Sequence, residues 1–167
     1  NISGGMFNFT GSSASSKTYT INLGGNYNQT GGSFGLVSSG YGSPNLACSV
    51  TFTGGVSSPT FSQSAGNFTV QNGGSRAISF FIANGKTLSL LTDFSLPPLT
   101  YSTLDSFIVY SGGTLNTNTY NLTGFGNFIL KPGGTLKMGS PNGITVYPTT
   151  SGKVQNVGAA AVRTFSK

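Results

Sequence analysis

The chain has 167 residues, which is long enough for one domain with a sizeable core. Its 13 phenylalanines exclude the disordered class, which lacks aromatic residues, while glycine is abundant at 26 residues and only 6% of the residues are charged. Histidine is absent and the only acids are Asp93 and Asp105, so Ser-His-Asp and Cys-His catalysis are excluded and no metal site is expected.

The charge is sparse but one-sided, with a formal net charge of +6 and most of the basic residues after residue 130. This excess favours contact with acidic polysaccharide or a lipopolysaccharide surface, and it also fits a role in solubility alone. Nucleic-acid binding is not expected, because there is no basic run and no tryptophan. Membrane insertion is not expected either, because no apolar run reaches the roughly 18 residues of a transmembrane helix.

Short segments that alternate apolar and polar residues predict β-strands along most of the chain. Gly, Asn, Ser or Pro residues bound each segment, and two longer stretches, 39–44 and 95–103, are expected to be loops. Helix signals are nearly absent, since the modest helix former at 157–162 is too short to be stable alone. In chain order, the alternating segments are 7–9, 19–23, 46–52, 78–82, 88–90, 107–109, 120–122, 128–130 and 136–138.

The single cysteine, Cys48, lies in the alternating segment 46–52. Its spacing from Leu46, Val50 and Phe52 predicts a side chain that points into the core. A reactive thiol needs a cationic or metal neighbour, which the surrounding sequence lacks. We therefore expect Cys48 to be a core residue, and one cysteine cannot form an internal disulfide.

An eight-residue pattern occurs twice, 34 residues apart, at 27–34 and 61–68. Both copies read aromatic, any, Gln, Ser or Thr, small, Gly, any, Phe. Such a repeat is typical of a stacked architecture, in which the aromatic residues form core ladders and the glycine forms the corner between them. Gln29 and Gln63 fall in phase with the aromatic residues, which predicts a stacked amide ladder in the interior.

A second repeat aligns residues 107–115 with residues 128–136, at an offset of 21. Units of roughly 20–34 residues fit one coil of a parallel β-helix, with each coil about 4.8 Å from the last. We therefore predict an all-β fold, in which residues 1–167 form a single right-handed parallel β-helix, or solenoid, of about six to seven irregular coils. The alternative is a β-sandwich of antiparallel hairpins, which the few Asn-Gly turns and the near-identity of the repeats disfavour.

Three segments carry a resemblance to a known family: Gly-Gly-Met-Phe-Asn-Phe-Thr-Gly-Ser-Ser at 4–13, Gln-Thr-Gly-Gly-Ser-Phe at 29–34, and the glycine-rich segment 126–145. Together they resemble the repeat regions of very large secreted cell-surface adhesins of Bacteroidetes. Those adhesins are exported by the type IX secretion system, and some are associated with gliding motility. The resemblance implies display at the cell surface, a repetitive structural or adhesive shaft, and no catalytic site.

The sequence thus leads us to expect a non-catalytic structural or adhesive segment of a secreted or cell-surface filament, without metal or cofactor. The alternative is a carbohydrate-binding or phage-tailspike-like β-helix module. Expected partners are surface polysaccharide or other cell-surface components, together with neighbouring repeats of the same chain. The candidate surface-binding residues are Tyr41, Tyr101, Lys131 and Lys137, and the competing interpretation is that these side chains only solvate the surface.

Both ends of the chain lack a polar cap. A β-helix has unpaired strand edges at its ends, and such edges invite pairing with another chain. We therefore expect the chain to be part of a longer protein or to pack end to end.

Overall fold

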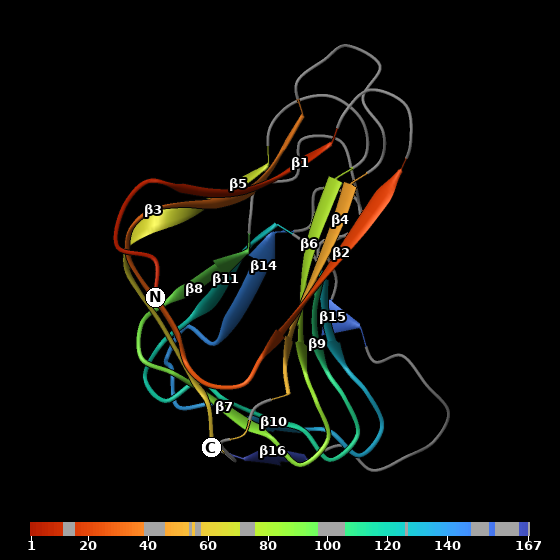
Figure 1. The fold of residues 1–167 in the computed structure, drawn as a ribbon. Coiled ribbons are helices and arrows are strands. Elements are labelled where there is room, and N and C mark those ends of the chain that lie inside the picture. The colour runs from red at the N-terminus through yellow and green to blue at the C-terminus, as the bar shows by residue number, and fades with distance from the viewer. Residues whose placement is uncertain are drawn as a thin grey trace.

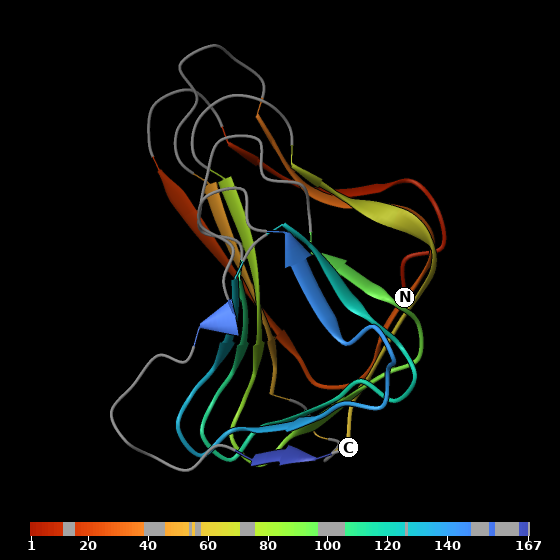
Figure 2. The same ribbon diagram turned by 180° about the vertical axis from the view of Figure 1, so that it is seen from behind.

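The strands of the chain form three parallel sheets that surround one hydrophobic core (Figures 1 and 2). This arrangement is seen in a computed structural model that describes residues 1–11, 16–38, 46–53, 55, 58–70, 76–96, 106–125, 127–147, 154–155 and 164–166. Every regular element among these residues is a strand, so the prediction of an all-β fold is confirmed.

The three sheets differ in size, and we name them A, B and C. Sheet A has seven strands, in the order β1 (Met6–Gly11), β3 (Tyr27–Ser38), β5 (Thr60–Val70), β7 (Thr87–Leu90), β10 (Thr114–Asn116), β13 (Thr135–Lys137) and β16 (Thr164–Ser166). Sheet B has six, in the order β2 (Lys17–Leu23), β4 (Leu46–Phe52), β6 (Arg76–Ile82), β9 (Ser106–Val109), β12 (Asn127–Leu130) and β15 (Val154–Gln155). Sheet C has three, in the order β8 (Phe94–Leu96), β11 (Leu122–Phe125) and β14 (Ile144–Tyr147).

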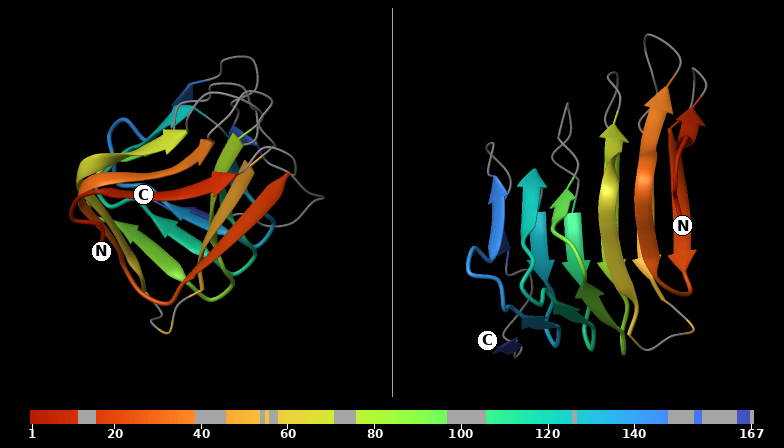
Figure 3. Two further views of the ribbon diagram at one scale, coloured as in Figure 1. Left: turned by 45° about the horizontal axis from the view of Figure 1, so that its top comes forward. Right: turned by 90° about the vertical axis from the view of Figure 1, so that its left-hand side faces the viewer.

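The chain visits the sheets in a regular order. From β1 to β6 it alternates between sheets A and B, and from β7 onward it passes through A, C and B in turn. We call each passage, such as β1 with β2 or β3 with β4, a layer. Successive layers lie side by side, with the two termini at opposite ends of the stack (Figure 3). All strand pairings in the described part of the chain are parallel, so the antiparallel hairpins of a β-sandwich are not found there.

Most of the strands lie where the alternating segments predicted them. Two predicted segments are shifted slightly, because Tyr120 precedes β11 and Met138 follows β13. One prediction is wrong in part: the expected loop at 95–103 begins inside strand β8. Phe94 and Leu96 both point into the core there, and the strand pairs with β11. The other expected loop, 39–44, and the short helix former at 157–162 lie outside the described residues.

The two octets pair with each other in the predicted register. Tyr27 lies beside Phe61, Gln29 beside Gln63 and Phe34 beside Phe68, on the neighbouring parallel strands β3 and β5. The pairing shifts register between Gln29 and residue 33, and the octet glycines at 32 and 66 have positive φ angles of 64° and 90°. A glycine adopts this conformation without steric cost, so the prediction of a glycine corner between two aromatic positions is confirmed.

In the second repeat, too, identical residues pair between neighbouring strands. Phe107 pairs with Phe128 between β9 and β12, and Leu115 pairs with Leu136 between β10 and β13. The ring centroids of Phe80 and Phe107 lie 6.4 Å apart and those of Phe107 and Phe128 lie 6.2 Å apart, both in stacked orientation. The core is therefore continuous from layer to layer, with one buried ring above the next.

Candidate functional surfaces

Two polar residues of the described part, Gln29 and Thr117, are fully buried, and the larger polar group is the amide of Gln29. Its Oε1 accepts hydrogen bonds from the Tyr27 hydroxyl at 2.8 Å and from the Gln63 amide at 2.9 Å. Its Nε2 donates to the carbonyl oxygens of Gly31, Gly32 and Asn67 at 3.2–3.3 Å. The predicted amide ladder is thus confirmed, and its chemistry is structural, because the amide is saturated by the protein itself.

The cysteine is equally unsuited to chemistry. Cys48 is 1% exposed and packs in the core, as predicted. Burial raises the pKa of its thiol from 9.0 to about 12, which keeps the thiol protonated at neutral pH. Because the thiolate is the nucleophile, Cys48 acts as a small hydrophobic residue.

In the described part of the chain, Asp93 is the one acidic residue, and it organises a turn. Its Oδ1 accepts hydrogen bonds from the backbone amide of Asn121 at 2.8 Å and from the side-chain amide of the same residue at 3.2 Å. Asn121 in turn accepts a hydrogen bond from the Ser140 hydroxyl, so the contact links three successive layers. Asp105, the other half of the only carboxylate pair, lies outside the described residues.

Of the four predicted surface-binding residues, the structure describes two. Tyr41 and Tyr101 lie outside the described residues. Lys137 is exposed at the end of β13, and Lys131 is half-buried directly after β12. The structure therefore keeps both lysines at the surface, and it places Lys131 at the corner between sheets B and A.

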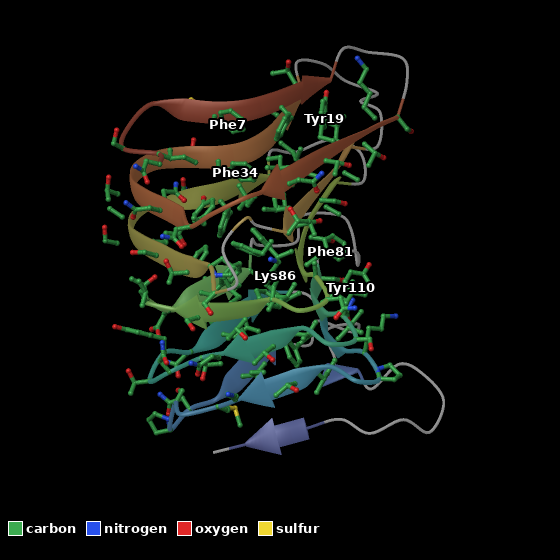
Figure 4. The ribbon with its side chains drawn as sticks, turned by 60° about the horizontal axis from the view of Figure 1, so that its bottom comes forward. Phe7, Tyr19, Phe34, Phe81, Lys86 and Tyr110 are labelled. Carbon is green, nitrogen blue, oxygen red and sulfur yellow. The ribbon has the colours of Figure 1, made fainter. Side chains whose placement is uncertain are left out.

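Lys131 borders an apolar patch on the outer face of sheet B. Phe81, Ile108 and Ile129 pair across β6, β9 and β12 in one half-buried ladder, opposite the inward phenylalanines of the same strands. Tyr110, which is 41% exposed, stacks on Phe81 with centroids 5.8 Å apart and an interplanar angle of 13° (Figure 4). We call these four residues with Lys131 the sheet B patch.

Tyr110 and Lys131 hold equivalent positions in adjacent layers. The backbone amide of Tyr110 donates to the carbonyl of Ile82 at 3.1 Å, and that of Lys131 donates to the carbonyl of Val109 at 2.9 Å. Strand alternation could have located this patch, because Phe81 and Ile108 each stand next to an inward phenylalanine and so point outward. The sequence interpretation assigned no role to either residue.

A second apolar surface lies at the end of the stack that holds β1 and β2 (Figure 4). Phe7 is 51% exposed there, and its ring stacks on that of Phe34 with centroids 5.7 Å apart. Phe9 stacks on Tyr19 at 4.5 Å, and the Tyr19 hydroxyl donates to the carbonyl of Thr10 at 2.8 Å. A pocket of about 210 Å³ opens in this surface, lined by residues that include Ile2, Phe7, Ile21, Leu23, Tyr27, Phe34 and Val50. We call this surface the end face.

Within the described ranges, no group of three or more His, Cys, Asp or Glu side chains is placed to hold a metal ion. None of the described residues forms a helix of the length and apolar character needed to span a membrane. Comparison with known proteins finds no matching family model, no matching curated protein and no matching solved structure.

Proposed function

We propose that the chain is a stretch of right-handed parallel β-helix that serves as a non-catalytic structural and adhesive segment of a secreted or cell-surface filament. The order in which the chain visits its sheets supports this proposal. Each passage returns to sheet A one strand further along. Each strand then pairs in parallel with the preceding strand of the same sheet. Seven passages in sheet A correspond to about seven coils.

The stacking of like on like carries the structural part of the proposal. Aromatic residues pair with aromatic residues between the octets, glutamine pairs with glutamine, and leucine pairs with leucine further along. Each layer is thus bound to the next by a row of backbone hydrogen bonds and by a shared core. Because every coil contacts only its neighbours, such a stack extends by repetition and forms a stiff spacer.

The use of the polar groups supports a non-catalytic role. Gln29, Asp93 and Cys48 are three of the buried or acidic groups in the described part of the chain, and all three are occupied by packing or by hydrogen bonds within the protein. Catalysis needs a titratable group that faces substrate. These three residues instead hold the layers together.

The sheet B patch favours polysaccharide binding as a second, adhesive function. Aromatic and aliphatic side chains pack against the apolar faces of sugars, and a flanking ammonium group attracts their carboxylate or sulfate groups. Tyr110 and Lys131 supply these two elements in adjacent layers. The patch therefore fits an anionic polysaccharide that lies along the sheet.

Binding to a panel of anionic and neutral polysaccharides tests the adhesive function. We expect the wild-type chain to bind a polyuronate or a sulfated polysaccharide, and the Tyr110→Ser and Lys131→Ala variants each to bind at least several-fold more weakly. Lys17→Ala is the matched control, since Lys17 is exposed on β2, outside the sheet B patch, and carries the same charge. Binding by no polysaccharide would leave the chain as a spacer only, and equal binding by all variants would show that the sheet B patch is not the binding site.

A further inference from the structure

The apolar side chains of the sheet B patch form a narrow row that crosses the strands. Phe81, Ile108 and Ile129 pair in register across β6, β9 and β12, so the row runs along the stack of layers. The row is narrow in the strand direction, because Ser106, two residues before Ile108, is buried and Asn127, two residues before Ile129, is polar. In the described part of sheet B, an elongated ligand therefore finds a continuous apolar surface along the stack.

A second row, with different chemistry, lies beside the apolar one. Ala83, Tyr110 and Lys131 directly follow β6, β9 and β12, so they hold equivalent positions in three successive layers. The carbonyl of each closes a turn by accepting a hydrogen bond from the amide three residues later, at 3.3, 2.9 and 2.9 Å respectively. Ala83 is small, and beside it the ring of Tyr110 stacks on that of Phe81 (Figure 4).

The turns fix the spacing between Tyr110 and Lys131. The amide of Gly85 donates to the carbonyl of Gly112 at 3.1 Å, and the amide of Gly112 donates to the carbonyl of Gly133 at 2.8 Å. These three glycines have similar φ angles of 72°, 72° and 77°, so the turns have the same shape. Stacked turns of one shape hold the residues that open them one layer apart, at about 4.8 Å.

The charge around the two rows is of one sign. The described strands β6, β9 and β12, with the turns that follow them, contain Arg76, Lys86 and Lys131 and no acidic residue. Lys131 is half-buried, which fits a lysine whose aliphatic stem packs on the surface while its ammonium group stays in water. A ligand that is complementary to the patch therefore carries an anionic group beside the part that contacts Phe81 and Tyr110.

We infer that the sheet B patch binds two consecutive sugars of an acidic polysaccharide that runs along the stack. One sugar ring packs on Phe81 and Tyr110, and the anionic group of the next sugar binds Lys131. This assignment rests on the adhesive function proposed above. One layer step of about 4.8 Å is close to the length that one pyranose ring adds to an extended chain. Lys131 is thus the residue that selects acidic over neutral polymers, whereas Tyr110 contacts both.

Moving the lysine at constant net charge tests the direction of the bound chain. Affinity electrophoresis with polygalacturonate and with dextran sulfate measures binding, and Lys131→Ala should weaken it by about three- to fivefold. Adding Ala83→Lys should restore it, because a polymer with an anionic group on every sugar presents one on either side of Tyr110. The matched control adds Thr114→Lys instead, since Thr114 lies beyond the turn on the outer face of sheet A and should restore nothing.

Restoration in both double variants, or in neither, would overturn the assignment of Lys131 to the neighbouring sugar. Failure of the wild-type chain to bind either polymer would instead overturn the adhesive function itself.

The length of the ligand provides a second test, which does not depend on the folding of Ala83→Lys. Galacturonic acid fills one of the two subsites and its disaccharide fills both, so the wild-type chain should bind the disaccharide several-fold more tightly. This gain should be smaller in Lys131→Ala, and Lys131→Ala should bind the carboxyl-reduced disaccharide as the wild type does. A monosaccharide that binds the wild type as tightly as the disaccharide, or weaker binding of the neutral disaccharide by Lys131→Ala, would overturn the two-sugar site and leave polysaccharide binding intact.

Discussion

At the scale of single residues, the buried amide of Gln29 distinguishes this core from a purely apolar one. It joins the hydroxyl of Tyr27 and the side chain of Gln63 to the backbone of two layers. A buried amide is tolerated only when its donors and acceptors are satisfied, so it also fixes the register of the strands that satisfy it. Both copies of the octet contain glutamine, and the Gln63 amide donates a hydrogen bond to the Gln29 amide oxygen.

Replacing Gln29 with leucine should therefore destabilise the protein strongly. The Tyr27 hydroxyl and the Gln63 amide lose their acceptor and three partly buried carbonyl oxygens lose a donor, so we expect the free energy of unfolding to fall by about 2–4 kcal/mol. Tyr27→Phe is the control, because it removes one hydrogen bond and should cost about 0.5–1.5 kcal/mol. Urea unfolding measures both variants, and an equal loss in the two would show that the amide has no special role.

Cys48 should make stability depend on pH in the alkaline range. Burial raises the pKa of its thiol from 9.0 to about 12, so the folded chain keeps the proton at a pH where the unfolded chain has lost it. The contribution of Cys48 is complete below pH 9.0 and is lost as the pH rises toward about 12. Burial also raises the pKa of Tyr27, which acts in the same direction at higher pH.

The measurement is urea unfolding at a series of pH values from neutral to alkaline, for the wild type and for Cys48→Ala. The wild type should lose stability more steeply above pH 9.0 than the variant, which lacks the thiol. Native Cys48 should also resist thiol reagents until the chain unfolds. Parallel pH profiles, or rapid labelling of the native chain, would be inconsistent with a buried thiol.

At the scale of elements, the irregular point at residue 32 inside β3 depends on glycine for two separate reasons. The positive φ angle is one, and the close approach of the preceding layer is the other. Gly5 and Gly32 separate these reasons. Both have positive φ, but only at Gly32 would an added Cβ meet the backbone of a neighbouring layer, at Gly4 and Gly5. The stacking of corners is therefore as specific as the stacking of side chains.

We expect Gly5→Ala to cost about 1–2 kcal/mol, the cost of a left-handed conformation for a residue with a Cβ. Gly32→Ala should cost about 1–3 kcal/mol more, because its Cβ would overlap backbone atoms of Gly5. Denaturant unfolding of the two variants measures the difference. If both variants lost the same stability, the first layer would not cover Gly32 as the structure has it.

At the scale of the whole molecule, the sequence predicted which residues pair but not which layer stands at the end. The octets at 27–34 and 61–68 pair as expected, because a repeat brings identical side chains into one ladder. Alternation alone makes Phe7 and Phe34 look alike, so the exposure of the end face could not be read from it. The strand β8 was missed because only three residues alternate before the prolines at 97 and 98.

The sheet B patch was missed for a related reason. Phe81 and Ile108 lie on separate strands, and only their pairing brings them into one ladder beside Tyr110. Lys131 was recognised as a surface residue from its charge, but its neighbours depend on the register between β9 and β12. Long-range register is thus the information that the sequence left open.

The register of the stacked layers is the central claim, and engineered disulfide formation tests it most directly. Thr114 and Thr135 pair between β10 and β13, on the partly exposed side, with neighbouring strands about 4.8 Å apart. A disulfide requires Cα atoms roughly 4.4–6.8 Å apart, so the Thr114→Cys/Thr135→Cys variant should cross-link fully under mild oxidation. The control is Asn116→Cys/Thr135→Cys, which is out of register because Asn116 pairs with Lys137. Non-reducing electrophoresis should show the intramolecular bond in the first variant only, and its absence there, or equal cross-linking in both, would contradict the stacked parallel arrangement.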